Sequence, residues 1–143
     1  MPIRKANAQW NGDLLKGNGT ISTETGVLNN TQFNFSSRFE EGKGTNPEEL
    51  IGAAHAGCYS MALSAGLSGG GFKVNWVKTS DTVHIDKVDG GFAITAIDIN
   101  CEANVEGISK EDFLKAAEDT KAGCPVSKAL TGVKFNLNAK LVE

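Results

Sequence analysis

Apolar and small residues fill almost every position of residues 44–67, and this run is the strongest structural signal in the chain. Asn46 followed by Pro47 is typical of a helix start, because the Asn side chain caps free N–H groups and proline has none to lose. No charged residue occurs from Leu50 to Leu67. We therefore predict a helix that is apolar on every side and enclosed by other structure. Its Gly, His and Ser residues make it a poor candidate for a membrane span, which needs about 20 strongly apolar residues.

Alternating apolar and polar residues predict strands on both sides of this helix. The expected strands, in chain order, are residues 6–10, 20–23, 33–39, 74–88, 97–105 and 133–141. The dipeptide Asp89-Gly90 is a tight-turn signal, so the two strands that flank it are expected to form a hairpin.

Two shorter helices are predicted in the C-terminal third of the chain. Residues 110–121 have an apolar stripe and follow Ser109, which is expected to cap the helix. Residues 125–130 are expected to form a second helix, with Cys124 at its start. No repeat or linker divides the sequence, so we predict a single domain over residues 1–143. The expected fold is α+β with antiparallel sheets, and dimerisation is the natural way to enclose the central helix.

The composition of the chain argues against several classes of function. The chain of 143 residues has 17 acidic and 14 basic residues and a net charge of −3, without a basic face, which argues against a nucleic-acid partner. The first residues contain no apolar signal core, so we expect a cytoplasmic protein without a membrane partner. Three cysteines and no CxxC motif do not suggest a disulfide-stabilised secreted domain.

The three cysteines therefore have to be judged as buried or reactive thiols. Cys101 lies on the apolar side of a predicted strand and is expected to be an inert core residue. Cys124 lies at a helix start, where N–H groups stabilise a thiolate. The sequence leaves open whether it is a reactive thiol or a buried structural one. Cys58 lies in mid-helix and needs a cation from elsewhere to be reactive. Arg38, on the polar side of its predicted strand, could supply that cation. Glu49 is expected to be a carboxylate that completes the helix cap with Asn46.

A metal site and a Cys–His hydrolase site are two other possibilities for His55 and Cys58, which lie on one helix face. A metal site lacks further ligands, since His84 has no companion in its strand, and no metal or cofactor is predicted. A Cys–His hydrolase would need an orienting acid, and none is evident in the sequence. His55 is therefore expected to be a buried histidine whose hydrogen bonds are satisfied.

The segments GTNPEELIGAAHAGCYSMAL and KAGCPVSKAL, with the lead-in FSSRFEEGKGTNPEEL, closely resemble the OsmC/Ohr family, and its OsmC branch most. The similarity extends over nearly the whole chain and includes TVHIDKVDGGFAITAI. Gly57 and Tyr59 stand where close relatives often have Ala and Phe. The resemblance implies an intertwined homodimer, with antiparallel sheets wrapped around two long central helices, that reduces organic hydroperoxides.

The resemblance also implies roles for individual residues. Cys58 would be the peroxidatic cysteine and Cys124 the resolving one, with Arg38 and Glu49 as a supporting pair. Cys58 would pass through a sulfenic acid to a disulfide with Cys124, which an external dithiol, such as a lipoyl group on a carrier protein, would reduce. The helix-start argument instead favours Cys124 as the more acidic thiol. We follow the resemblance, because an ion pair outweighs a helix-dipole effect of about 1 kcal/mol.

A geometric prediction follows for the site. Glu49 and Cys58 are nine residues apart, which is about 900° of helical rotation and about 13 Å along the axis. They would therefore meet only between two helices that run antiparallel about a two-fold axis, which predicts composite sites in a dimer. A redox-sensing dimer and an apolar-ligand-binding dimer, both without significant turnover, are the alternatives to a peroxidase.

Overall fold

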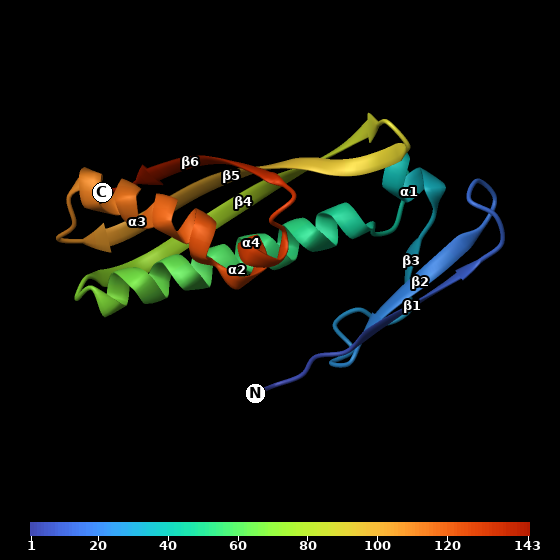
Figure 1. Ribbon diagram of the computed structural model, residues 1–143. Coiled ribbons are helices and arrows are strands. Elements are labelled where there is room, and N and C mark those ends of the chain that lie inside the picture. The colour runs from blue at the N-terminus through green and yellow to red at the C-terminus, as the bar shows by residue number, and fades with distance from the viewer. The chain divides into compact units, whose positions relative to one another are not determined.

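The structure, a computed structural model, describes residues 1–143 and contains two three-stranded sheets and four helices. The fold is α+β, as the hydrophobic pattern predicts. The chain divides into two compact units, Met1–Leu50 and Ile51–Glu143, each with its own sheet (Figure 1). In chain order the elements are β1 (Ala6–Asn11), β2 (Asn18–Thr23), β3 (Thr31–Phe33), α1 (Phe35–Phe39), α2 (Pro47–Gly69), β4 (Lys73–Val88), β5 (Gly91–Glu106), α3 (Lys110–Gly123), α4 (Pro125–Ala129) and β6 (Lys134–Leu141).

The unit Met1–Leu50 is built on the antiparallel sheet β1–β2–β3. In its centre, Gly19 of β2 pairs with Trp10 of β1 on one side and Phe33 of β3 on the other. The two aromatic rings lie 5.3 Å apart between centroids. A Cβ atom on Gly19 would lie 2.4 Å from the Phe33 ring, so only glycine lets the two rings meet over this strand.

Residues 33–39, predicted as a single strand, contain the end of β3 and the whole of α1. Asn34 is the reason, because its side chain accepts a hydrogen bond from the Ser37 N–H at 2.8 Å, while the Ser37 hydroxyl accepts one from the Asn34 N–H at 2.9 Å. This reciprocal cap starts a helix despite the alternating pattern. The strand prediction is therefore wrong here, and Arg38 lies in the last turn of α1.

The central helix is confirmed as α2, and Asn46 caps it by accepting a hydrogen bond from the Glu49 N–H at 2.8 Å. One side of α2 is buried within the unit Ile51–Glu143, but the other elements of this unit do not enclose the helix, and Met61 keeps 74% of its surface exposed. Small residues are exposed beside it, namely Ala53, Ala54, Gly57 and Ala65. By length and composition alone α2 could cross a membrane, which is weak evidence because core helices of soluble proteins pass the same test.

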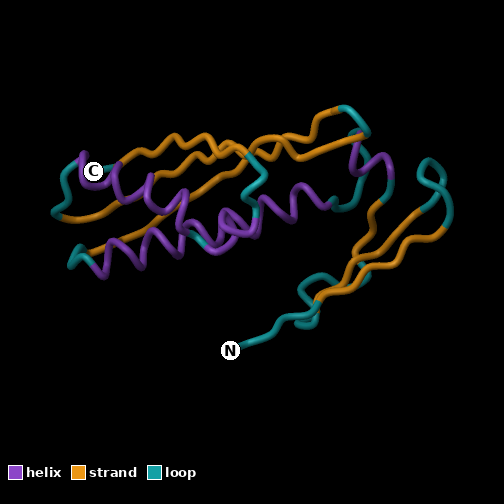
Figure 2. The backbone as a smooth tube through the Cα atoms, in the orientation of Figure 1, coloured by secondary structure: helices purple, strands orange, loops and turns teal.

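The unit Ile51–Glu143 contains the long β4–β5 hairpin, which turns at Asp89-Gly90 as predicted (Figure 2). The third strand, β6, pairs with β5 in parallel, so the expectation of purely antiparallel sheets is wrong for this pair. The reason is the crossover through α3 and α4, which returns the chain to the same end of the sheet before β6 begins.

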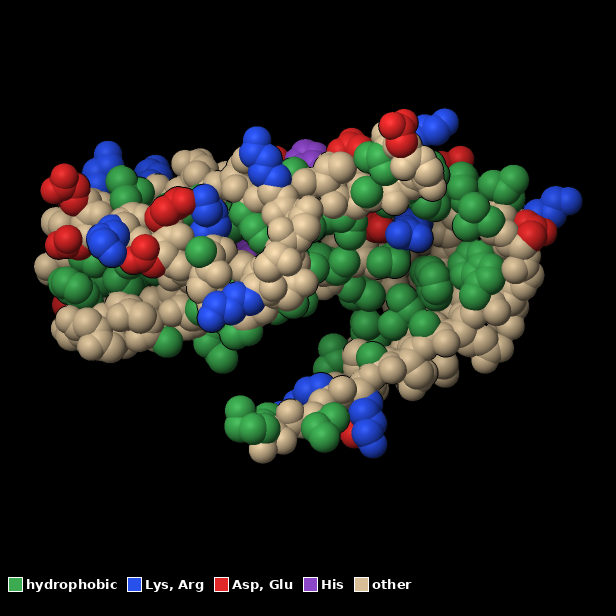
Figure 3. Space-filling model, in the orientation of Figure 1, with side chains coloured by type: hydrophobic (Ala, Val, Ile, Leu, Met, Phe, Trp, Pro, Cys, Tyr) green, Lys and Arg blue, Asp and Glu red, His purple; other side chains and the backbone are tan.

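Both long helices pack on the same face of this second sheet (Figure 1). The core contains Tyr59, Leu63 and Leu67 from α2, Phe113 from α3 and the inward side chains of β5, listed as Ile97, Ile99, Cys101, Ala103 and Val105. On the face drawn in Figure 3, acidic and basic side chains are interspersed without a patch of one sign, consistent with the small net charge.

Candidate active site

The thiols of Cys58 and Cys124 interact where the middle of α2 meets the start of α4, and each affects the pKa of the other. Cys124 is buried and Cys58 is half-buried, and both are free thiols. The backbone N–H of Val126, in the first turn of α4, also interacts with both sulfur atoms. The structure thus brings together the two cysteines that the sequence singled out.

The surroundings act on the two thiols in opposite directions. Burial raises the pKa of Cys58, and the adjacent Cys124 adds to this increase although the Val126 N–H opposes it. Burial also acts to raise the pKa of Cys124, but its hydrogen bonds with the Ser127 hydroxyl and the Ser127 backbone N–H outweigh it, so the pKa is lowered overall. This direction agrees with the helix-start argument, since Cys124 is the N-cap of α4 and accepts from the Ser127 N–H at 3.3 Å.

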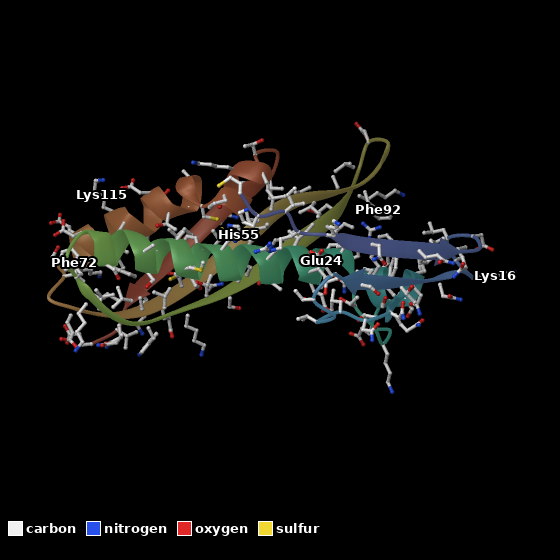
Figure 4. The ribbon with its side chains drawn as sticks, turned by 90° about the horizontal axis from the view of Figure 1, so that it is seen from below. Lys16, Glu24, His55, Phe72, Phe92 and Lys115 are labelled. Carbon is white, nitrogen blue, oxygen red and sulfur yellow. The ribbon has the colours of Figure 1, made fainter.

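A buried hydrogen-bonded path leads from Cys124 back to α2. The Cys124 sulfur lies 3.3 Å from the Ser127 hydroxyl, which lies 2.8 Å from His55 Nε2. The other ring nitrogen of His55, Nδ1, lies 2.5 Å from a carboxylate oxygen of Asp81 on β4. His55, labelled in Figure 4, is fully buried and stacks on Phe135 of β6.

Two predictions about His55 are settled by this path. His55 is a buried histidine with both nitrogens partnered, as expected. The sequence shows no acid that would orient His55, and the structure supplies one, Asp81. The only sequence signal was that Ser127 follows a possible N-cap cysteine by three residues. Asp81 gave no signal, since it lies 26 residues from His55 and meets it only through the packing of α2 on β4.

Arg38 and Glu48 form a separate group of candidate residues within the unit Met1–Leu50. Arg38 Nε and Nη2 donate to the same oxygen of Glu48 at 3.1 and 2.9 Å. The carboxylate that holds Arg38 is therefore Glu48 and not the expected Glu49. Glu49 is the third residue of the capped turn, and its carboxylate accepts from the Thr45 hydroxyl at 2.8 Å.

Arg38 also borders a small aromatic cavity. This cavity has a volume of about 290 Å³ and lies between β1, β3 and α1. The Arg38 guanidinium carbon lies 5.2 Å from the centre of the Phe39 ring. The other lining residues are Trp10, Leu14, Phe33, Asn34 and Phe35. A guanidinium at the edge of aromatic walls suits a ligand with one polar and one apolar end.

Cys101 stays apart from this chemistry. Its side chain belongs to the core of the second sheet, and burial raises its pKa. It is therefore a protonated core thiol, as predicted.

Comparison with known proteins supports the sequence resemblance. The family model described as OsmC-like protein matches residues 40–138. Peroxiredoxin OsmC of Escherichia coli is 53% identical over 127 residues, which cover 89% of this chain and 89% of the relative. Organic hydroperoxide resistance protein-like 1 of Staphylococcus epidermidis is 35% identical over 111 residues, which cover 72% of this chain and 74% of the relative.

Solved structures agree with this result. The OsmC-like protein of Mycoplasma pneumoniae matches with a TM-score of 0.75 over 99% of both chains at 16% identity, which shows the shared fold. The organic hydroperoxide resistance protein OhrB of Bacillus subtilis matches with a TM-score of 0.70 at 26% identity, over 95% of this chain and 98% of that chain. On the family match and the identity to its curated relatives, this chain belongs to the OsmC family.

Proposed function

We propose that this chain is a cysteine-based peroxidase that reduces organic hydroperoxides to alcohols through Cys58 and Cys124. The contact between the two thiols is the observation that carries the proposal. An oxidised nucleophilic cysteine is recovered when a second cysteine within bonding reach converts it to a disulfide. The names of the relatives, peroxiredoxin and organic hydroperoxide resistance protein, indicate the same class of chemistry.

In the first step the Cys58 thiolate attacks one peroxide oxygen. An S–O bond forms as the O–O bond breaks, and the departing alkoxide takes a proton and leaves as the alcohol, with Cys58 left as a sulfenic acid. Because burial raises the pKa of Cys58, its thiolate needs a cation. We assign this role to Arg38, which would also donate a hydrogen bond to the leaving oxygen, while Glu48 keeps the guanidinium in position.

The aromatic cavity beside Arg38 supports a bulky apolar hydroperoxide as the substrate. Trp10, Phe33, Phe35 and Phe39 would hold the apolar group, and the guanidinium would face the peroxide. Hydrogen peroxide has no apolar group to bury there, so it would gain nothing from these walls.

The proposed active form is an intertwined homodimer with composite sites. Glu48 and Cys58 are ten residues apart on α2, which separates them by about 15 Å along the helix axis. Two copies of α2 that run antiparallel about a two-fold axis would bring Arg38 and Glu48 of one copy to Cys58 of the other. The exposed face of α2 around Met61 supports this assembly, because a second copy would cover it.

In the second step Cys124 attacks the sulfenic sulfur of Cys58, which gives a disulfide and water. A dithiol, of which lipoyl groups on carrier proteins are one class, would then reduce the disulfide in the cytoplasm. No metal or cofactor takes part in these steps.

Single-cysteine variants test the proposed chemistry. With cumene hydroperoxide and a dithiol, Cys58→Ser is expected to consume no peroxide, and Cys124→Ser to complete one turnover and then become over-oxidised at Cys58. Cys101→Ser is the matched control and should keep steady turnover. Full turnover by Cys58→Ser would refute the peroxidase mechanism. If the parent protein is oxidised by the peroxide but does not turn it over, a redox sensor is favoured. If the parent is inactive but binds an apolar ligand, a ligand-binding dimer is favoured.

Complementation tests the composite site. Arg38→Ala and Cys58→Ser are each expected to be inactive, but co-expression should restore about a quarter of the parent activity, because half of randomly paired dimers contain one intact site of two. If each site lay within one chain, no pairing would contain an intact site and the mixture would stay inactive.

A further inference from the structure

The buried hydrogen-bonded path from Cys124 to Asp81 contains more polar groups than the packing of one cysteine requires. Four groups from three elements, namely Cys124, Ser127, His55 and Asp81, form three consecutive contacts of 3.3, 2.8 and 2.5 Å. All four side chains are buried. Burying a polar group is costly even when it is hydrogen-bonded, so an apolar core would serve stability equally well.

The chemistry of the four groups sets the direction of each hydrogen bond. An ionised Asp81 carboxylate only accepts, so His55 donates to it from Nδ1. In a neutral imidazole Nε2 is then an acceptor, and the Ser127 hydroxyl donates to it. The Ser127 oxygen is left to accept from the Cys124 thiol. A proton can therefore leave Cys124 as Ser127 passes its own to His55, without any side chain moving.

A proton received by the His55 ring would face one carboxylate and otherwise neutral groups. One oxygen of Asp81 is buried with no partner, so a positive charge on the imidazole would compensate a carboxylate that is otherwise only half satisfied. Tyr59 of α2 donates its hydroxyl to the Ala117 carbonyl, and burial raises its pKa, so it stays neutral. Burial raises the pKa of Cys101 of β5, which interacts electrostatically with Asp81, so Cys101 is also neutral. Phe135 of β6, which stacks on His55, is apolar.

We propose that Ser127 passes the proton of Cys124 to His55, positioned by Asp81, when Cys124 forms its disulfide with Cys58, and that the same path returns a proton to Cys124 on reduction. Ser127 contacts the reacting sulfur of Cys124, whereas His55 and Asp81 are positioning residues that act through Ser127. The inference rests on the proposed peroxidase function and adds a specific proton path to the second cysteine.

The step balances in both directions. The S–S bond forms as the S–O bond of the sulfenic acid breaks, the thiol proton goes to His55, and the departing hydroxide takes a proton to leave as water. His55 then releases its proton to solvent. On reduction, a dithiol supplies two electrons and releases its two thiol protons, and Cys124 leaves as a thiolate. His55, after taking up one proton from solvent, passes a proton through Ser127 that makes Cys124 a thiol again.

Alkylation of Cys124 as a function of pH tests the path without any peroxide. In a Cys58→Ser background, the rate of iodoacetamide addition to the Cys124 peptide is followed by mass spectrometry, and its midpoint gives the pKa of Cys124. A groove of about 370 Å³ between α2 and α3, which Cys124 lines, offers a route for this small reagent. Ser127→Ala and His55→Gln are each expected to raise the midpoint by about one pH unit or more.

The pH profile separates a proton path from a structural role. A change in the exposure of Cys124 would scale the rate equally at every pH and leave the midpoint in place. Ser127→Thr, which keeps the hydroxyl, should restore the parent midpoint. His84→Gln is the matched control, because His84 also bonds a carboxylate, Asp98, at 2.7 Å, but on the exposed part of the second sheet. If the Ser127→Ala and His55→Gln midpoints shift no more than that of His84→Gln, the proposal is overturned.

A single-turnover experiment connects the path to catalysis. One equivalent of cumene hydroperoxide is mixed with reduced protein, and peroxide loss and disulfide formation are followed separately. In Ser127→Ala the disulfide should form about 10²-fold more slowly than in the parent, and the Cys58 sulfenic acid should accumulate. Equal disulfide rates in parent and variant would refute the proton path. A parent that consumes no peroxide would refute the proposed function, while the alkylation profile would still decide the path.

Discussion

Replacing Glu48 or Glu49 by glutamine distinguishes two adjacent carboxylates that the structure gives different partners. Glu48→Gln keeps the shape of the side chain but removes the charge that faces Arg38. The Gln oxygen can still accept both Arg38 hydrogen bonds, but its amide N–H₂ group would lie where a Glu48 oxygen is now buried without a partner. Glu49→Gln keeps an oxygen for the Thr45 hydroxyl on an exposed side chain.

The contacts set the size of the two effects. Hydrogen bonds to a charged group contribute about 1.5–3 kcal/mol each, and a neutral acceptor contributes about half of that. The two Arg38 bonds would therefore lose about 2 kcal/mol, reduced to about 1 kcal/mol because 38% of the Arg38 side chain is exposed to screening solvent. If the loss acts on the reactive position of Arg38, kcat/KM falls about fivefold. Glu49→Gln should change it by less than about twofold, since surface changes stay within about 0.5 kcal/mol.

The assay is steady-state reduction of cumene hydroperoxide with a dithiol, with thermal unfolding of each variant measured alongside. The expected order of kcat/KM is parent, then Glu49→Gln close behind, then Glu48→Gln. A loss in Glu49→Gln equal to or larger than that in Glu48→Gln would show that the Arg38–Glu48 contact is not the functional pair. A fall in unfolding temperature matching the fall in rate would show that Glu48 acts on stability alone.

Two further outcomes are expected for the unit Ile51–Glu143. Tyr59→Phe removes the buried 2.8 Å hydrogen bond to the Ala117 carbonyl and should lower the free energy of unfolding in urea by about 1 kcal/mol. Hydrogen bonds from Asn136 and His84 lower the pKa of Asp98, so its stabilising effect is present at neutral pH and is lost as the pH falls through the folded-state pKa. Asp98→Asn should therefore make the acid-side loss of stability below about pH 4 shallower, and Asp89→Asn, in the hairpin turn, should not.

The sequence predicts the elements of this fold well where one local rule decides. Asn46 with Pro47 places the start of α2, and the Asp89-Gly90 turn places the β4–β5 hairpin. It fails at residues 33–39, where a strand-like alternation and a helix cap compete and the cap prevails. The parallel pairing of β6 with β5 depends on where the crossover ends, which no local pattern records.

The site shows the same division between local and tertiary information. Cys58 and Cys124 are recognisable because each lies in a distinctive segment, and the acidity of Cys124 follows from its N-cap position. The choice between Glu48 and Glu49 turns on a rotation of one helical position, which only the structure resolves. Asp81 could not be found from sequence, since its role exists only through its contact with His55.

In the proposed mechanism the two cysteines need acidity at different moments, and their surroundings affect the acidity of each differently. Ser127 and the start of α4 belong to the same unit as Cys124, so its lowered pKa is permanent. That suits a sulfur which must attack as soon as a sulfenic acid forms beside it. Within its own unit Cys58 receives one stabilising contact, from the Val126 N–H, and burial outweighs it, so we assign its activation to a cation, Arg38. The proposed dimer with composite sites therefore predicts that a chain kept monomeric retains an acidic Cys124 but does not cleave peroxide. Dilution, or Met61→Asp on the exposed face of α2, should separate the two properties.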